Sequence, residues 1–120
     1  MNCQEAIARA DEYKRNTVSA ELKCLWLKEL DATVLNHVIS KHEGEIPSLP
    51  SYSIESEEDL LIPHPYDVIY PRYIVMRLDD MLQETEKYNH SSQLFNEALA
   101  SYKAWYTREH MPISQGTWRF

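Results

Sequence analysis

The chain has 120 residues, of which 43% are hydrophobic and 26% are charged, and its formal net charge is −7. These values predict one globular domain with its own core, and they exclude an intrinsically disordered chain. Because an acidic chain is poorly suited to neutralising phosphates, direct nucleic-acid binding is not expected.

The first predicted element is a short helix over residues 2–15, with Ile7 and Tyr13 as its main apolar side chains. Asp11 and Arg15 have the spacing of an ion pair on one helix face. A helix of this length is marginal by itself, so we expect it to dock on the other helices.

A second and longer helix is predicted from Ser19, a favourable N-cap, to about His42, with Gly44 as its stop. Its main apolar face comprises Leu22, Leu25, Trp26, Leu30, Val34 and Val38. Further apolar side chains lie off this face, at Leu27, Leu35 and Ile39. A face this broad indicates contact with two neighbouring elements or an interface, and we favour the first interpretation.

Residues 43–63 form a long connection with three prolines and an acidic run at residues 55–59. Residues 52–54 and 60–62 are candidate short strands that could pair with each other. Connections of this length in a compact domain are usually functional or partly disordered. We therefore expect either a functional or partly disordered loop or an ordered surface loop without a role.

The stretch 60–88 has a proline-marked entry and then a long helical pattern, around which the other elements are expected to pack. One stripe of this pattern comprises Tyr66, Tyr70, Tyr73, Ile74, Leu78, Met81, Leu82, Thr85 and Tyr88. Pro71 is unfavourable inside a helix, so the regular helix either begins near Pro71 or is kinked there, and we prefer the first alternative. Residues 88–92 are expected to break or bend this helix.

A fourth helix is predicted after that break, capped by Asn89 or Ser91 and extending to about His110, because Pro112 ends it. Its apolar face comprises Leu94, Phe95, Ala98, Leu99, Tyr102, Trp105 and Tyr106.

The predicted fold is all-α: an irregular bundle of about four helices, with a long loop between the second and the third. Residues 1–112 form the single helical domain, and residues 113–120 form a C-terminal tail. The predicted core includes Leu22, Trp26, Leu30, Tyr70, Ile74, Leu78, Leu82, Phe95, Leu99 and Tyr102.

The sequence contains no convincing catalytic or metal-binding constellation. Glu86 and His90 are one helical turn apart, but two ligands are a weak metal signal. Asp79, Asp80 and Glu84 are interpreted as a solvated helix face. Neither a nucleophile elbow nor a phosphate-binding loop is present. We therefore expect no catalysis, no metal and no cofactor.

Cys3 and Cys24 suggest no disulfide framework and are expected to be free thiols in a reducing compartment. The N-terminal segment lacks the apolar run of a signal peptide, and no apolar run is long enough to span a bilayer. These features predict a protein that is made and used in a cytosol.

Several stretches in a fixed order span about residues 16–112. They comprise Lys23, Trp26, Leu27, Glu29, Leu30, Asp31, Leu60, Leu61, Ile62, Pro63, Pro65, Tyr66, Asp67, Tyr70, Glu86, Tyr88, Asn89, Phe95, Asn96, Trp105, Tyr106, Arg108, His110 and Pro112. In these residues the chain resembles a family of small helical head–tail connector, or neck adaptor, proteins of tailed phages and prophages, chiefly of Firmicutes. Pro71, where the family has a helix former, and His90, where a second Asn is common, depart from the pattern.

The resemblance implies a protein that docks as a ring beneath the portal after DNA packaging and links head to tail. Its partners would be the portal protein, neighbouring adaptor subunits and the next neck or tail protein. It would catalyse no reaction, contact no membrane and let packaged DNA pass without specific binding. Its place would be the neck of the virion, and the host cytoplasm during assembly.

Partner contacts are expected at two places in the chain. Trp and Arg are enriched at binding hot spots. The candidate partner-binding residues are Tyr52 and Ile54 in the long loop, and Ile113, Trp118, Arg119 and Phe120 in the tail. The tail rings either cover the protein's own bundle or dock on a neighbouring subunit or the portal.

Two other functional classes remain open from the sequence. One is a non-viral helical protein–protein interaction module or regulator, which would form a stable dimer or bind a dedicated partner. The other is a small hydrolase or metal enzyme whose site carries no recognised motif.

Overall fold

A computed structural model describes residues 1–111 and consists of helices joined by loops, which confirms the predicted all-α bundle. The elements are α1 (Cys3–Tyr13), α2 (Ala20–His37), η1 (Ile39–Lys41), η2 (Tyr66–Val68), α3 (Ile69–Met81) and α4 (Thr85–Glu109), where η denotes a 3₁₀ helix. Within these residues no helix is long and apolar enough to cross a membrane.

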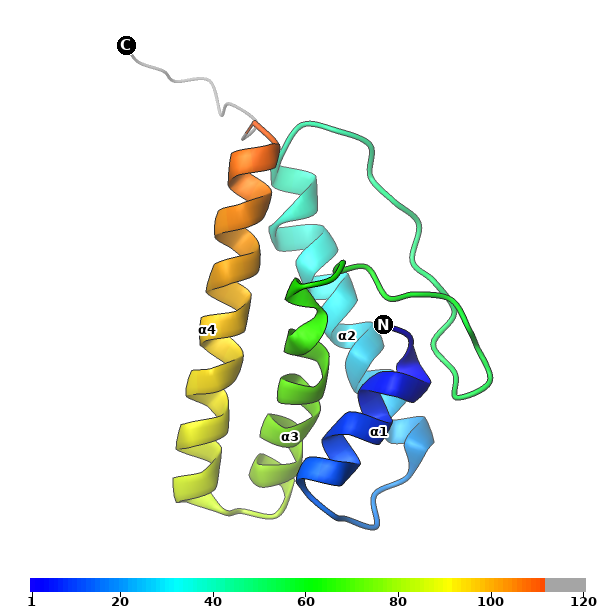
Figure 1. Cartoon of the computed structure of the whole chain (residues 1–120), viewed down its shortest axis with the longest axis vertical. Helices are drawn as coiled ribbons and strands as arrows, with labels where there is room; N and C mark the ends of the chain where they lie inside the picture. The colour runs from blue at the N-terminus through cyan, green and yellow to red at the C-terminus, as the bar shows by residue number, and fades with distance from the viewer. Residues whose placement is uncertain (112–120) are drawn as a thin grey trace.

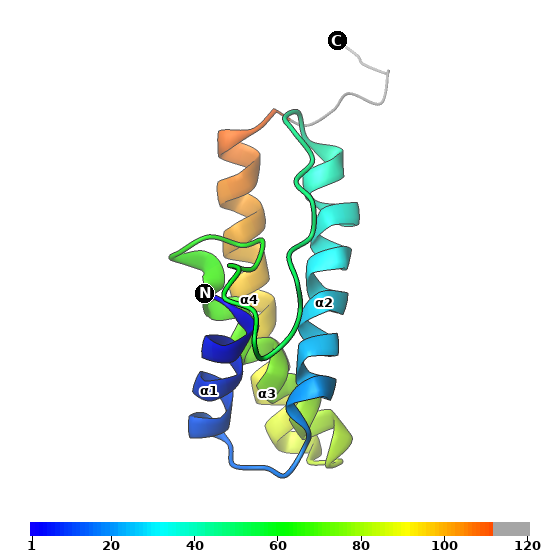
Figure 2. The same ribbon diagram turned by 90° about the vertical axis from the view of Figure 1, so that its right-hand side faces the viewer.

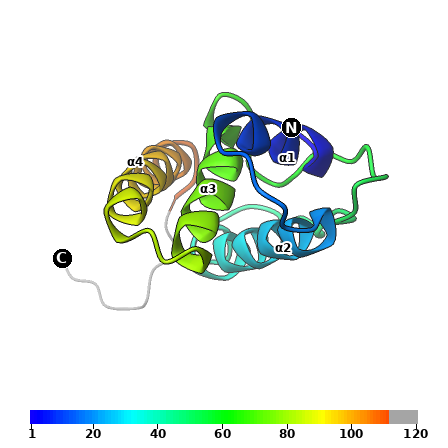
Figure 3. The same ribbon diagram turned by 90° about the horizontal axis from the view of Figure 1, so that it is seen from below.

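Helix α3 is the centre of the bundle, because it packs against α1, α2 and α4 (Figure 1). Seen from below, α4 lies on one side of α3, and α1 and α2 lie on the other (Figure 3). Its side chains Tyr70, Ile74 and Leu78 are fully buried. The packing therefore agrees with the prediction that the other elements pack around the stretch 60–88, which contains α3.

Helix α1 starts at a capping box, in which Asn2 accepts a hydrogen bond from the Glu5 backbone at 2.9 Å and Glu5 accepts one from the Asn2 backbone at 3.2 Å. The expected Asp11–Arg15 pair is absent from the described ion pairs, because the helix ends at Tyr13. Asp11 instead binds the buried Lys23 ammonium at 2.7 Å. Tyr13, expected on the apolar face, is 70% exposed.

Helix α2 begins as predicted, with the Ser19 hydroxyl accepting the backbone N–H of Leu22 at 3.2 Å. It ends at His37 and continues only as the short turn η1, so Gly44 lies in the loop and is not its stop. Its buried residues contact both α1 and α3, as expected from the broad apolar face. Leu25, however, is 49% exposed, whereas Leu27 is fully buried.

The preferred interpretation of Pro71 is confirmed, because η2 covers Tyr66–Val68 and the regular helix α3 starts at Ile69. Pro71 therefore lies in the first helical turn. Backbone N–H groups have no intrahelical partner there, so a proline removes no bond.

The predicted break at residues 88–92 is wrong, since those residues lie inside α4 and neither Asn89 nor Ser91 is an N-cap. The chain turns earlier, where Gln83 has a φ of 57°. The backbone N–H of Glu84 donates to Asp79 O at 3.0 Å, and that of Gln83 donates to Asp80 O at 3.1 Å. This pair of bonds is a Schellman motif, which usually has glycine where this chain has Gln83.

The early turn also corrects the predicted core. Leu82 caps α3 and is 48% exposed. Leu22 and Leu99 are half-buried against the core. The other predicted core residues are buried as expected, namely Trp26, Leu30, Tyr70, Ile74, Leu78, Phe95 and Tyr102.

The two short strands predicted in the long loop do not form in the described residues. An isolated bridge joins Asp59 of the loop to Asn2. The backbone donors of Leu61 and Ile62 bind the side chains of Asp31 and Tyr70 instead of another strand. Side-chain acceptors thus replace the expected strand pairing.

Leu78→Ala and Leu82→Ala provide a matched test of this fold, because both leucines were expected in the core and only Leu78 is buried. Leu78→Ala should lower the free energy of unfolding by about 2–5 kcal/mol through the cavity that it leaves. Leu82→Ala should change it by no more than about 0.5 kcal/mol. Urea unfolding followed by circular dichroism measures both, and equal losses would contradict the observed helix break.

Candidate functional site

Asp31 on α2 is fully buried and binds three donors. The hydroxyls of Tyr52 and Tyr70 each donate to it at 2.6 Å, and the backbone N–H of Leu61 donates at 3.2 Å. Tyr70 in turn accepts the backbone N–H of Ile62 at 2.7 Å. This Asp31 network, formed by these five residues, ties the long loop to α2 and α3.

The Asp31 network changes the titration of its members. Burial raises the pKa of Asp31, and the hydrogen bonds from Tyr52, Tyr70 and Leu61 only partly oppose that rise. Burial and the neighbouring Asp31 carboxyl also raise the pKa of both tyrosines. Neither phenol is therefore poised to release a proton at neutral pH. The network is suited to holding the loop in place.

A second network joins α1, α3 and α4 around Asp79, which is 3% exposed. Asp79 accepts hydrogen bonds from the Lys14 ammonium and from the Ser91 hydroxyl, the latter at 2.7 Å. Lys14 also binds Glu84 at 3.1 Å. The interpretation of Asp79, Asp80 and Glu84 as one solvated face is therefore wrong for Asp79. The cause is that Lys14 comes from the C-cap of α1, which the spacing of residues on α3 does not reveal.

The pKa values of Lys14 and Glu84 in this second network shift in the directions that their contacts require. Burial lowers the pKa of Lys14, but the hydrogen bonds to Asp79 and Glu84 outweigh it and raise the pKa overall. Hydrogen bonds from Lys87 and Lys14 lower the pKa of Glu84. Ion pairs of Lys14 therefore connect the end of α1 to the turn between α3 and α4.

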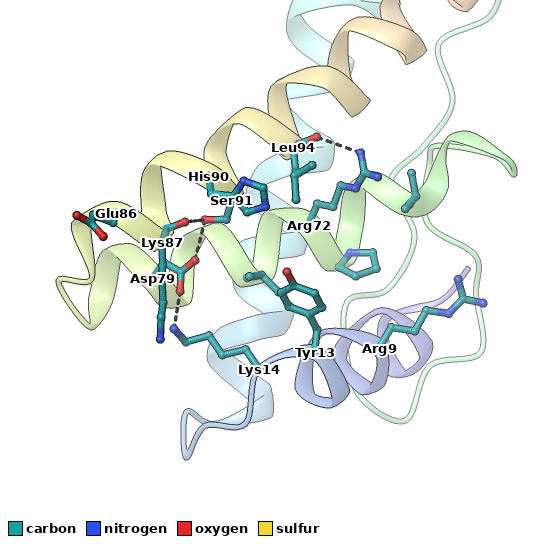
Figure 4. A pocket seen from close by; sticks show the side chains of 13 residues that line it. Arg9, Tyr13, Lys14, Arg72, Asp79, Glu86, Lys87, His90, Ser91 and Leu94 are labelled. Carbon is teal, nitrogen blue, oxygen red and sulfur yellow. Dashed lines mark hydrogen bonds and ion pairs between the residues drawn. The ribbon is translucent and has the colours of Figure 1, made fainter.

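Beside the second network lies a groove of about 760 Å³ between α1, α3 and α4. Its apolar lining includes Val68 of η2, Pro71 and Val75 of α3 and Leu94 of α4. Figure 4 shows Tyr13 of α1 standing between Arg9 at one end and Lys14 near Lys87 at the other. The cationic side chains that line it are Arg9, Lys14, Arg72 and Lys87, and the acidic ones are Asp79 and Glu86.

The cations of the groove are only partly neutralised. Lys14 forms ion pairs with Asp79 and Glu84 of the second network, and Lys87 forms one with Glu84. Within residues 1–111, Arg9 and Arg72 have no carboxylate partner, and Arg72 donates instead to the Leu94 carbonyl at 3.1 Å. The groove is therefore a locally basic, apolar surface on an acidic protein.

The long loop forms a second distinctive surface. Figure 2 shows it running in front of the gap between α1 and α2. At its turn Ile54 is 41% exposed, and Glu55, Glu57 and Glu58 around it are also exposed. We call residues 51–58 the acidic loop. The hydroxyl of Tyr52, a predicted partner-binding residue, donates to Asp31 and anchors this loop.

A third feature is a cluster of aromatic rings where α4 ends. Tyr66 stacks on Trp105 with centroids 5.2 Å apart, and Tyr106 stacks on His110 at 4.0 Å. The Glu43 backbone N–H also donates to the Met111 carbonyl at 2.8 Å. The chain is therefore held firmly up to Met111. The other predicted partner residues, Ile113, Trp118, Arg119 and Phe120, lie outside the described residues.

Among residues 1–111 no group of three or more His, Cys, Asp or Glu side chains could hold a metal ion. Glu86 and His90, the weak pair noted above, both line the groove.

The groove itself was missed by the sequence analysis. No sequence pattern indicated it, because its lining residues come from α1, α3 and α4, which are far apart in the sequence.

Comparison with known proteins adds no relative. No family model matches this chain, and no curated protein or solved structure matches it significantly.

The Asp31 network predicts a pH dependence of stability with a definite sign. The raised pKa means that Asp31 holds its proton more tightly in the folded chain than in the unfolded one. Its stabilising contribution is therefore complete below the ordinary pKa of 3.8 and is lost as pH rises through the raised value. Relative to Asp31→Asn, wild-type stability should fall as pH rises across this interval.

Urea unfolding of both proteins at several pH values measures this difference. Asp80→Asn is the matched control, because it removes an exposed carboxyl from the surface of α3. A wild-type advantage over Asp31→Asn that grows with pH would contradict the assigned direction.

Proposed function

We propose that this protein is a head–tail connector, or neck adaptor, of a tailed phage or prophage. It docks as a ring beneath the portal, extends the channel and presents a surface to the next neck or tail protein. It acts by binding alone and catalyses no reaction.

The Asp31 network is the observation that carries this proposal. The residues on which the family resemblance rests are far apart in sequence, yet four of them, Asp31, Leu61, Ile62 and Tyr70, meet there through hydrogen bonds. Trp105, Tyr106 and His110, from the same set, form the aromatic cluster. The resemblance therefore follows the residues that shape the fold, which a chance likeness in composition would not do.

The surfaces suit a protein that works by docking. The acidic loop is held in place by Asp31 before any partner arrives, so its binding loses little conformational entropy. The net charge of −7 also suits a channel through which DNA passes without being gripped. Repeated weak contacts become strong when identical subunits engage a portal together.

The tail provides the direct test of the docking role. A chain truncated after Pro112 should melt like the full-length protein, because the described bundle is complete by Met111. It should nevertheless fail to join portal-bearing heads, because Trp118, Arg119 and Phe120 supply hot-spot contacts. Thermal unfolding and co-sedimentation with heads measure the two properties.

The full-length triple variant Trp118→Ala/Arg119→Ala/Phe120→Ala is the matched control for chain length. A truncated chain that melts well below full length would place the tail rings in the protein's own core. A truncated chain that still joins heads would remove the tail from the docking role.

The free protein should be monomeric or weakly associated at micromolar concentration, because premature rings would compete with ordered assembly on the portal. Sedimentation velocity measures this directly. A tight dimer would oppose the connector proposal and favour a non-viral interaction module or regulator.

A further inference from the structure

A ring of identical subunits needs two different surfaces that fit each other on every copy. Each subunit then uses one surface to bind the next subunit and the other to bind the preceding one. The acidic loop and the basic groove are two such surfaces on this chain, and their charges are opposite.

The acidic loop has the form of a projecting anchor. Ile54 is 41% exposed at its turn and is flanked by the exposed carboxylates of Glu55 and Glu57. The loop is internally bonded, with Ser51 N–H donating to Glu58 Oε2 at 3.1 Å and Ser56 N–H donating to Ser53 O at 3.2 Å. An apolar side chain on a preorganised support is the usual form of a binding hot spot.

The groove has the complementary form. Pro71, Val75 and Leu94 offer an apolar floor, and Arg9 and Lys87 lie at opposite ends (Figure 4). Its volume of about 760 Å³ holds a stretch of several residues. An isoleucine between carboxylates therefore matches it both in polarity and in charge.

One copy cannot fill its own groove with its own loop. The loop lies on the side of α1 and α2 away from α4, whereas the groove lies between α1, α3 and α4 (Figures 1 and 3). The bonds of Tyr52 and Leu61 to Asp31 hold the loop on its own side. The loop is therefore available to a second copy.

We infer that the acidic loop of one copy docks in the groove of the next, with Ile54 against the apolar floor and Glu55 and Glu57 toward the basic ends. The contact is head-to-tail, so its repetition gives a ring if the rotation closes. The inference rests on the proposed function for its ring, and it names the surfaces that would build one.

Site-directed cross-linking tests the contact in the full-length protein. An Ile54→Cys variant, labelled with ¹⁵N, is mixed at high concentration with an unlabelled Leu94→Cys variant under mild oxidation by glutathione disulfide. Labelled–unlabelled dimers should exceed both kinds of homodimer several-fold by mass spectrometry. The native Cys3 and Cys24 are buried, and wild type mixed with either variant measures their background.

Ser101→Cys is the matched control for Leu94→Cys, because Ser101 is exposed on α4 and does not line the groove. A Leu94→Cys yield no higher than that of Ser101→Cys would overturn the inference.

Charge reversal tests the electrostatic part. Glu55→Lys/Glu57→Lys in the loop copy, or Arg9→Glu/Lys87→Glu in the groove copy, should each reduce the cross-link, and combining them should restore it. Lys28→Glu/Lys103→Glu, two exposed positions outside the groove, should change little. Reversals without effect, or a combination without recovery, would overturn the proposed pairing of loop and groove.

The same pair of cysteines on portal-bearing heads separates this inference from the proposed function. If wild type joins heads but the Ile54–Leu94 cross-link never forms there, the inference fails and the connector function stands. If the cross-link forms in solution but wild type never joins heads, the connector function fails and the self-docking surfaces stand.

Discussion

The buried Asp31 carboxyl is the interaction on which the remaining structure depends. A carboxyl without partners would be unfavourable in this core, so its three donors must stay in place. Two of them, Tyr52 and Leu61, belong to the long loop, and the third is Tyr70 at the start of α3. Asp31 therefore connects the long loop to α2 and to the first turn of the central helix.

A second buried carboxyl, that of Asp79, joins the helices at the other end of the bundle. Asp79 accepts from Lys14 of α1 and from Ser91 of α4, so it links both helices to α3 beside the helix turn. Within the described residues every buried side-chain polar atom has a hydrogen-bond partner. The groove between α1, α3 and α4 lies beside this contact, since Lys14, Asp79 and Ser91 all line it. A structural ion pair thus borders a potential docking surface.

The distribution of charge connects the fold with the proposed function. The chain is strongly acidic as a whole, yet Arg9, Lys14, Arg72 and Lys87 gather around one apolar groove. The acidic loop collects opposite charge around one exposed isoleucine on another side of the molecule. Like charge on most of the surface keeps free copies apart. Under the proposed function, the opposite charges of the acidic loop and the groove let copies bind each other in one orientation once a portal concentrates them.

The amino-acid sequence by itself determined the helical class, the Ser19 cap, the start of α3 near Pro71 and most of the core, because those depend on local periodicity and on backbone restrictions. Only the tertiary structure decided the turn at Gln83, where a residue other than glycine adopts the left-handed conformation and so leaves no turn signal. It also decided the burial of Asp31 and Asp79, the anchoring of Tyr52 and the existence of the groove. Each of these features depends on which side chain, distant in the sequence, becomes the partner. The spacing of residues along one helix does not contain that information.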